Sequence, residues 1–118
     1  MKILLIRHAA RVVDRSLEDK ETPLSSEGKA ETWRRGDQLQ RMNVRPALYL
    51  TSRHHQAQQM GALLAAQLEP ESAPPIVTLS ALTPGCKAYT WAEVVDEARD
   101  RQLDLRTFNV VAIIGHEP

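Results

Sequence analysis

Two short apolar runs that each end in a histidine constrain the fold of this chain more than any other feature. The first is KILLIRH, residues 2–8, and the second is NVVAIIGH, residues 109–116. Runs rich in Ile, Leu and Val are typical of strands buried within a parallel sheet. The carboxyl ends of such strands form the ligand crevice of an open α/β sheet. We therefore expect His8 and His116 to share one pocket, with Arg7 beside them.

Two imidazoles and a guanidinium favour an anion, and a phosphoryl group is the anion that suits a guanidinium fork best. The chain as a whole carries 15 Lys and Arg against 15 Asp and Glu, so its formal net charge is zero. A basic surface is needed for general binding to nucleic acid or other polyanions. The composition therefore excludes nucleic acid as an expected partner and leaves room only for a local positive pocket.

The length of 118 residues indicates a single domain over residues 1–118. A single cysteine rules out an internal disulfide framework and fits a reducing compartment. Only four apolar residues precede Arg7, fewer than the roughly 7 of a signal segment, and no run approaches the roughly 18 of a membrane span. We expect a soluble, cytoplasmic protein without a membrane partner.

Three segments carry the start signals of helices. Ser25 or Ser26 is a candidate N-cap for a helix that ends near residue 42, and Ser52 is a candidate N-cap for a helix over about 53–68. Thr90 and Glu93 form a capping box for a third helix, which ends near residue 102. Expected buried positions on the first two helices are Ala30, Trp33, Leu39, Ala57, Met60, Leu64 and Leu68, and Trp91 is expected to pack as well.

Strands are expected at four places: residues 2–8, 47–51, 76–79 and 109–116. The resulting order βαβαβαβ implies right-handed crossovers and a mostly parallel sheet. We therefore expect an α/β fold, a three-layer sandwich with helices on both faces of the sheet. The long polar loop over residues 9–24 is a candidate lid over the strand ends.

Four segments, in order, resemble the signature motifs of the histidine phosphatase superfamily, also called phosphoglycerate mutase-like. Arg7-His8-Ala9 resembles its RHG signature, and IIGHEP at the end of the chain resembles its GHEP-type motif. PLSSEGKAE (residues 23–31) resembles PLTxxGxxQA, and LTSRHHQAQQM (residues 50–60) resembles SSPxxRAxQTA. The short length and the ALTPG stretch (residues 81–85) are most similar to SixA-type phosphohistidine phosphatases.

The resemblance implies a mechanism for the predicted pocket. His8 would attack phosphorus and form a phosphohistidine, which water then hydrolyses. Arg7 would bind phosphoryl oxygens, and His116 would donate to the same oxygens as charge builds in the transition state. Phosphohistidine proteins are the favoured substrates, with small phosphate esters as an alternative. Inorganic phosphate or sulfate is an expected ligand of the pocket.

The chain departs from the family pattern at the second arginine, whose usual position is held by Gln56. Glutamine donates a hydrogen bond but carries no charge. Arg53, three residues earlier, is a candidate to replace the missing guanidinium as a phosphate-binding residue, or else a solvated surface arginine. The neutral Gln56 leaves open a pseudo-phosphatase that binds phosphoryl groups or a phosphoprotein without turnover.

Two further departures concern the general acid and the end of the chain. No carboxylate lies between residues 81 and 89, where many family members carry the general acid. SixA-type enzymes also tend to lack a general acid at this place. Asp14 is the nearest alternative candidate for this role. The P–N bond of phosphohistidine needs less proton donation than an ester. The chain stops two residues after His116, where the family usually continues with another helix and strands, so we expect an unpaired strand edge.

A metal site is the remaining alternative for the histidines, since His54 and His55 lie at the start of the second helix, near the predicted pocket. One of these two histidines is expected to be exposed and the other to line the rim of the crevice. Arg7 and Arg53 would repel a cation there, and no carboxylate completes a ligand set. We expect no metal and no cofactor.

Overall fold

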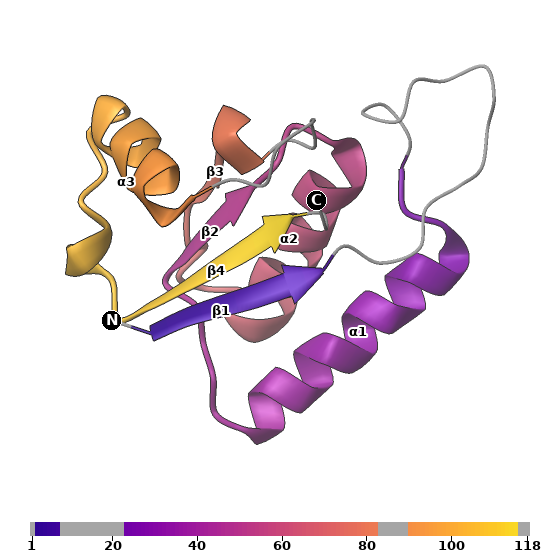
Figure 1. Ribbon diagram of the computed structural model, residues 1–118. Helices are drawn as coiled ribbons and strands as arrows, with labels where there is room; N and C mark the ends of the chain where they lie inside the picture. Colours follow the sequence, from indigo (N-terminus) through magenta and orange to yellow (C-terminus); the bar gives the residue numbers. More distant parts are fainter. Residues whose placement is uncertain (1, 8–22, 83–89, 116–118) are drawn as a thin grey trace, which may run out of the picture.

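The computed structural model describes residues 2–7, 23–82 and 90–115. Its centre is a four-stranded sheet in which all pairs are parallel, in the order β1-β4-β2-β3 (Figure 1). Along the chain the elements are β1 (Lys2–Arg7), α1 (Ser26–Arg41), β2 (Leu48–Thr51), α2 (His55–Leu68), β3 (Ile76–Thr78), the short 3-10 helix η2 (Ser80–Leu82), α3 (Trp91–Asp100), the 3-10 helix η3 (Leu105–Thr107) and β4 (Val110–Gly115). The expected α/β fold is confirmed.

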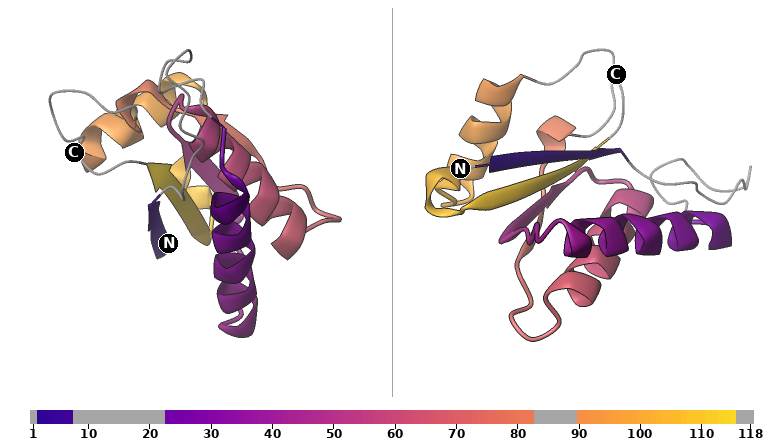
Figure 2. Two further views of the ribbon diagram at one scale, coloured as in Figure 1. Left: turned by 90° about the vertical axis from the view of Figure 1, so that its right-hand side faces the viewer. Right: turned by 90° about the horizontal axis from the view of Figure 1, so that it is seen from below.

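The helices lie on both faces of the sheet. Figure 2 shows α1 and α2 together on one face and α3 on the other. Each face has its own apolar cluster, because alternate residues of a strand point to opposite sides. Tyr49, Ala112 and Ile114 pack on the side of α2, whereas Leu50, Val111 and Ile113 pack on the side of α3. The three expected layers are therefore present.

Local capping explains where two of the helices begin. The Ser25 hydroxyl accepts a hydrogen bond from the Gly28 N–H at 3.0 Å, so Ser25 rather than Ser26 is the N-cap of α1. At α3 the capping box of Thr90 and Glu93 is complete in both directions. Both predicted helix starts are confirmed.

The buried face of α1 differs from the predicted one. It consists of Gly28, Thr32, Gly36 and Leu39, while Ala30 is exposed and Trp33 is 64% exposed. The small residues let α1 approach α2 closely: a Cβ atom on Gly36 would collide with the side-chain amide of Gln67. Trp91 is also 40% exposed, so the prediction that both tryptophans are packed was wrong.

The two apolar runs that define the sheet are not buried equally. β4 lies between β1 and β2, and its residues 111–115 are all buried. β1 lies at the edge: Ile6 is buried towards α2, but Ile3 is 43% and Leu5 is 68% exposed. The expectation of burial on both faces is correct for β4 and wrong for β1. Within the described residues, no helix is long and apolar enough to cross a membrane.

Candidate active site

The carboxyl ends of β1, β4 and β2 meet at one edge of the sheet. Arg7, the last residue of β1, pairs with Gly115, the last residue of β4, and Thr51 at the end of β2 pairs with Ile114. The next residue after β2 continues this alignment, because the Ser52 N–H donates to the Ile114 carbonyl at 3.2 Å. The register therefore aligns the three strand ends to within one residue.

His8 and His116, the two predicted catalytic histidines, lie outside the described residues. In the sequence, each directly follows one member of the Arg7–Gly115 pair. The structure thus describes the strand positions that lead to both histidines and brings these positions next to each other. The candidate lid over residues 9–24 falls almost entirely outside the described part of the chain, as do Asp14 and residues 83–89.

The turn from β2 to α2 is longer than the sequence indicated. Ser52 is fully buried, and its hydroxyl accepts a long hydrogen bond from the His54 N–H at 3.4 Å. His54, with extended backbone angles, is the N-cap, and α2 begins at His55, so the prediction of Ser52 as the N-cap was wrong. The amino end of a helix presents N–H groups without helical acceptors and favours an anion. Here that end follows directly from the carboxyl end of β2.

Gln56 is the most unusual side chain at this edge. It is 1% exposed, and its Oε1 has no hydrogen-bond partner among the described residues. Its Nε2 lies 3.4 Å from His54 Nδ1. Flipping the terminal amide of Gln56 exchanges the positions of Oε1 and Nε2. In the flipped form, Oε1 accepts from His54 Nδ1–H, and Nε2 is the donor without a partner. A buried, unpaired polar group costs about 1–3 kcal/mol, which marks Gln56 as a candidate for a ligand contact.

The residues before Gln56 divide into exposed and half-buried ones. Arg53 is exposed and precedes the first residue of α2, so the helical spacing that was expected to place it on the same face as Gln56 does not apply. His54 is half-buried and His55 is exposed, in line with the expectation of one histidine at the rim and one in solvent. The part of the chain that the structure describes contains no cluster of three or more metal-ligating side chains.

Sequence reasoning missed three polar residues near the strand ends. Thr51 and Ser52 are buried, and Thr51 Oγ1 lies 3.5 Å from Thr78 Oγ1 on β3. Gln59 on α2 accepts a hydrogen bond from the Leu24 N–H at 2.8 Å, which fixes the end of the long loop against α2. A hydroxyl pair at the end of LYLTS is a recognisable signal, whereas the Gln59 contact spans 35 residues and has none.

Glu97 of α3 shapes the segment that follows β3. Its two carboxylate oxygens accept from the backbone N–H groups of Ser80 and Ala81, at 2.6 and 2.7 Å. These are short, charge-assisted hydrogen bonds, and they attach η2 to α3. The segment 83–89, which lacks a carboxylate in the sequence, begins directly after η2. Glu97 therefore fixes the starting point of that segment.

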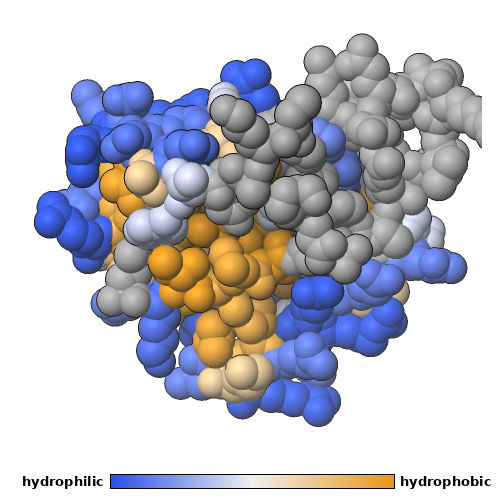
Figure 3. Space-filling view, in the orientation of Figure 1, coloured by the Kyte–Doolittle hydropathy of each residue, from blue (hydrophilic) through white to orange (hydrophobic). Residues whose placement is uncertain are grey.

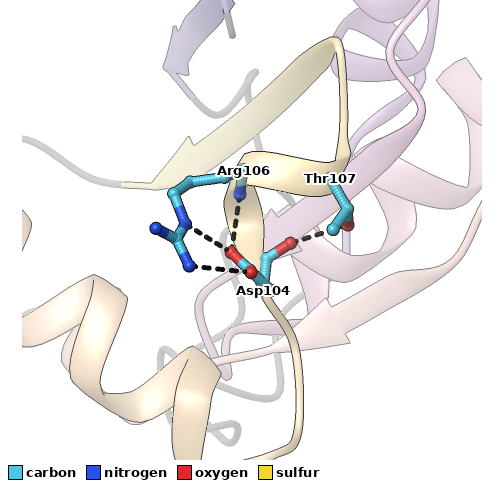
Figure 4. Close-up of polar contacts among 3 residues, drawn as sticks. All are labelled: Asp104, Arg106 and Thr107. Atoms are coloured by element: carbon cyan, nitrogen blue, oxygen red, sulfur yellow. Dashed lines mark hydrogen bonds and ion pairs between the residues drawn. The ribbon is translucent and has the colours of Figure 1, made fainter.

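A second polar cluster lies at the amino edge of the sheet, before β4. Figure 4 shows Asp104 accepting from the backbone N–H of Arg106 at 3.1 Å and from its guanidinium at 3.0 and 3.1 Å. Hydrogen bonds from Arg106 lower the pKa of the Asp104 carboxyl. Thr107 Oγ1 also donates to the Asp104 carbonyl at 2.7 Å. The cluster caps η3, and exposed pairs of this kind contribute little stability.

The groove beside this cluster does not belong to the candidate active site. It has a volume of about 450 Å³ and is lined by Trp91, Val95, Arg99 and residues 102–106. None of these residues lies at the carboxyl ends of the strands. The backbone positions that lead to His8 and His116 lie instead at the carboxyl ends of β1 and β4.

Comparison with known proteins identifies the fold. A SixA protein histidine phosphatase complexed with tungstate superposes with a TM-score of 0.78 at 24% identity, covering 100% of this chain and 70% of that one. A structure from Agrobacterium tumefaciens that carries the SixA assignment gives 0.73 at 20% identity, with coverages of 98% and 69%. The α-ribazole phosphatase from Shigella flexneri gives 0.65 at 15% identity, with coverages of 99% and 74%.

Comparisons at the level of sequence are negative: no family model matches the chain, and no curated protein does. The likeness therefore rests on the order β1-β4-β2-β3 and the helices around it. These solved structures are members of the histidine phosphatase, or phosphoglycerate mutase-like, superfamily. The chain has the fold of that superfamily, in the form seen in the SixA phosphohistidine phosphatases.

Proposed function

We propose that this chain is a phosphatase that hydrolyses phosphoryl groups through a phosphohistidine intermediate on His8. The observation that carries the proposal is the register that pairs Arg7 with Gly115. Because neighbouring strands lie about 4.8 Å apart, residues that follow such a pair can reach one phosphoryl group. The proposal puts the imidazoles of His8 and His116 on opposite sides of that group.

The reaction has two displacements at phosphorus. A neutral ring nitrogen of His8 attacks, its P–N bond forms, and the bond to the leaving group breaks. Water then attacks the phosphohistidine, which releases inorganic phosphate and restores His8. Arg7 and His116 hold the non-bridging oxygens as negative charge builds on them. The amide of Gln56 contributes a further, uncharged donor through Nε2.

Phosphohistidine proteins are the substrates that this set of groups suits best. The leaving group is then an imidazole nitrogen, which departs with less proton donation than an alkoxide. The absence of a carboxylate from residues 81–89 and the neutral Gln56 both limit the help available to a poor leaving group. The likeness to a SixA protein histidine phosphatase that binds tungstate, a tetrahedral oxyanion, supports the same substrate class.

One assay tests the reaction and the substrate together. The protein is incubated with a phosphohistidine protein, an aryl phosphate and a sugar phosphate, and phosphate release is measured. We expect release from the phosphohistidine protein first, and a phosphoenzyme that is labile in acid and stable in base. His8→Ala should abolish both signals, whereas His55→Ala, which changes an exposed histidine, should keep them. Full turnover by His8→Ala would refute the assignment.

A pseudo-phosphatase is the second candidate, and the burial of Gln56 favours it. A buried neutral amide at the position of the family's second arginine stabilises a bound anion less than a guanidinium does. In that case calorimetry detects phosphate or vanadate binding that depends on Arg7, while none of the three substrates releases phosphate. Binding with turnover supports the phosphatase, and the absence of both overturns the two candidates together.

A further inference from the structure

The polar groups at the end of β2 lie beneath the surface of the protein. Figure 3 shows hydrophobic side chains gathered over β1 and β4. Within the described residues, the buried aliphatic hydroxyl and amide side chains are uncharged, and they belong to Thr32, Thr51, Ser52 and Gln56. Three of these four lie between the last residue of β2 and the first turn of α2. A buried neutral group depends on its hydrogen-bond partners, so the pairing of these groups limits what can bind beside them.

The backbone of His54 is held on both sides, which fixes the position of its imidazole. Its N–H donates to Ser52 Oγ at 3.4 Å, and its carbonyl accepts from the N–H groups of Ala57 and Gln58 at 3.1 and 3.2 Å. His54 is the N-cap of α2, yet its side chain makes no capping hydrogen bond. Instead, its Nδ1 lies 3.4 Å from Gln56 Nε2.

This contact fixes the direction of the Gln56 amide in the structure. An Nε2–H group donates only to an Nδ1 that carries no proton. Oε1 of the 1% exposed Gln56 is then the end without a partner among the described residues. An acceptor in that position would repel a phosphoryl oxygen. The proposed mechanism uses Gln56 as a donor, which requires the flipped amide, and the flipped amide requires a proton on His54 Nδ1.

We propose that His54 is a positioning residue that selects which end of the Gln56 amide faces a bound oxyanion. When the oxyanion binds, the amide flips, Nε2 donates to a phosphoryl oxygen, and Oε1 accepts from Nδ1–H. The proton reaches Nδ1 from the other ring nitrogen by exchange with water, so the ring stays neutral. Both ends of the buried amide are then paired, which favours the bound form. This role rests on the proposed function, which takes Gln56 as a donor to the phosphoryl group.

Nitrogen NMR of the whole chain reads the ring of His54 directly, because protonated and unprotonated ring nitrogens differ in chemical shift. The spectra are recorded at about pH 8, where an ordinary histidine is neutral. We expect Nδ1 of His54 to carry no proton without added ligand and to carry one with saturating phosphate or vanadate. The exposed His55 is the internal control, and its ring should not change. In Gln56→Met the same ligand should leave His54 unchanged, because no amide oxygen remains to accept from Nδ1–H.

Two acidic variants measure the cost of holding the amide in the wrong direction. A carboxylate only accepts hydrogen bonds, so His54→Asp should hold Nε2 and leave Oε1 facing the oxyanion. His55→Asp adds the same charge at an exposed position one residue away and is the matched control. By calorimetry, we expect His54→Asp to raise the Kd for phosphate at least about tenfold more than His55→Asp does. The excess should vanish in a Gln56→Met background. His54→Asn, whose amide can donate in place of Nδ1–H, should restore binding.

The outcomes separate the role of His54 from the proposed function. Phosphate binding by the wild type without a change at His54 Nδ1, or equal losses in the two acidic variants, overturns the role of His54 and leaves the phosphatase proposal standing. Binding with the change at Nδ1 but without turnover supports the role of His54 in a pseudo-phosphatase. The absence of any phosphate or vanadate binding by the wild type overturns both proposals.

Discussion

Replacing Gln56 by Met should stabilise the protein and weaken its binding of oxyanions at the same time. Met has nearly the same volume as Gln, so the substitution keeps the packing of a side chain that is 1% exposed. It removes the Oε1 atom that has no partner among the described residues, which relieves about 1–3 kcal/mol of desolvation. It also removes the 3.4 Å contact with His54 Nδ1, a long hydrogen bond of at most about 0.5 kcal/mol.

The net expectation is a gain of about 1 kcal/mol in the free energy of unfolding, or about 3–6 °C in Tm for a chain of this size. Thermal melts and urea titrations measure the gain in the free protein. The same melts with phosphate or vanadate measure the loss of binding, because at a fixed ligand concentration the ligand stabilises the folded state by RT ln(1 + [L]/Kd), which falls as the Kd rises. The variant should therefore start higher and respond less to the ligand.

Gln56→Arg is the opposite change. It buries a cation, which should lower the Tm of the free protein. Added oxyanion should restore stability, and the extra charge-assisted bond of about 1.5–3 kcal/mol should raise affinity or turnover roughly 10- to 100-fold, most for esters with poor leaving groups. If Gln56→Met loses stability, or if neither variant changes the response to oxyanion, then Gln56 is a packing residue and α2 does not face the ligand.

Three further changes test the packing that supports the site. Burial raises the pKa of Tyr49 to about 12 from 10.0. The neutral phenol therefore contributes stability that is complete below pH 10 and is lost as the pH rises towards 12. In buffered melts between about pH 9 and 11, the Tm of Tyr49→Phe should fall less than the Tm of the wild type. Glu97→Gln should cost about 1–2 kcal/mol in urea unfolding, because the amide keeps one acceptor oxygen and turns its NH2 donor towards the other of the two backbone N–H groups, those of Ser80 and Ala81. An unchanged midpoint would contradict the role given to those bonds. Thr90→Ala removes the cap of α3 and should cost about 1 kcal/mol, measured by the same titration, with Thr90→Ser as the control that keeps the hydroxyl.

The sequence by itself determined the order and type of the elements. An N-cap acts within one turn, so the capping box at Thr90 could be identified from neighbouring residues, and the start of α1 could be narrowed to Ser25 or Ser26. The apolar run over residues 109–116 was predicted to be a buried parallel strand, and the burial of β4 confirms this. Alternating strands and helices then left a parallel sheet as the expected architecture.

Only the tertiary structure decided which strand lies at an edge and which helix face is buried. KILLIR and NVVAIIG look alike as sequences, yet Leu5 is 68% exposed because strand order, a long-range property, puts β1 outside β4. Trp33 is exposed because α1 packs through Gly28, Thr32 and Gly36, and apolarity alone does not predict a contact made through small residues. The burial of Gln56 likewise depends on where α2 meets the sheet, since that position is set by packing between segments far apart in the chain.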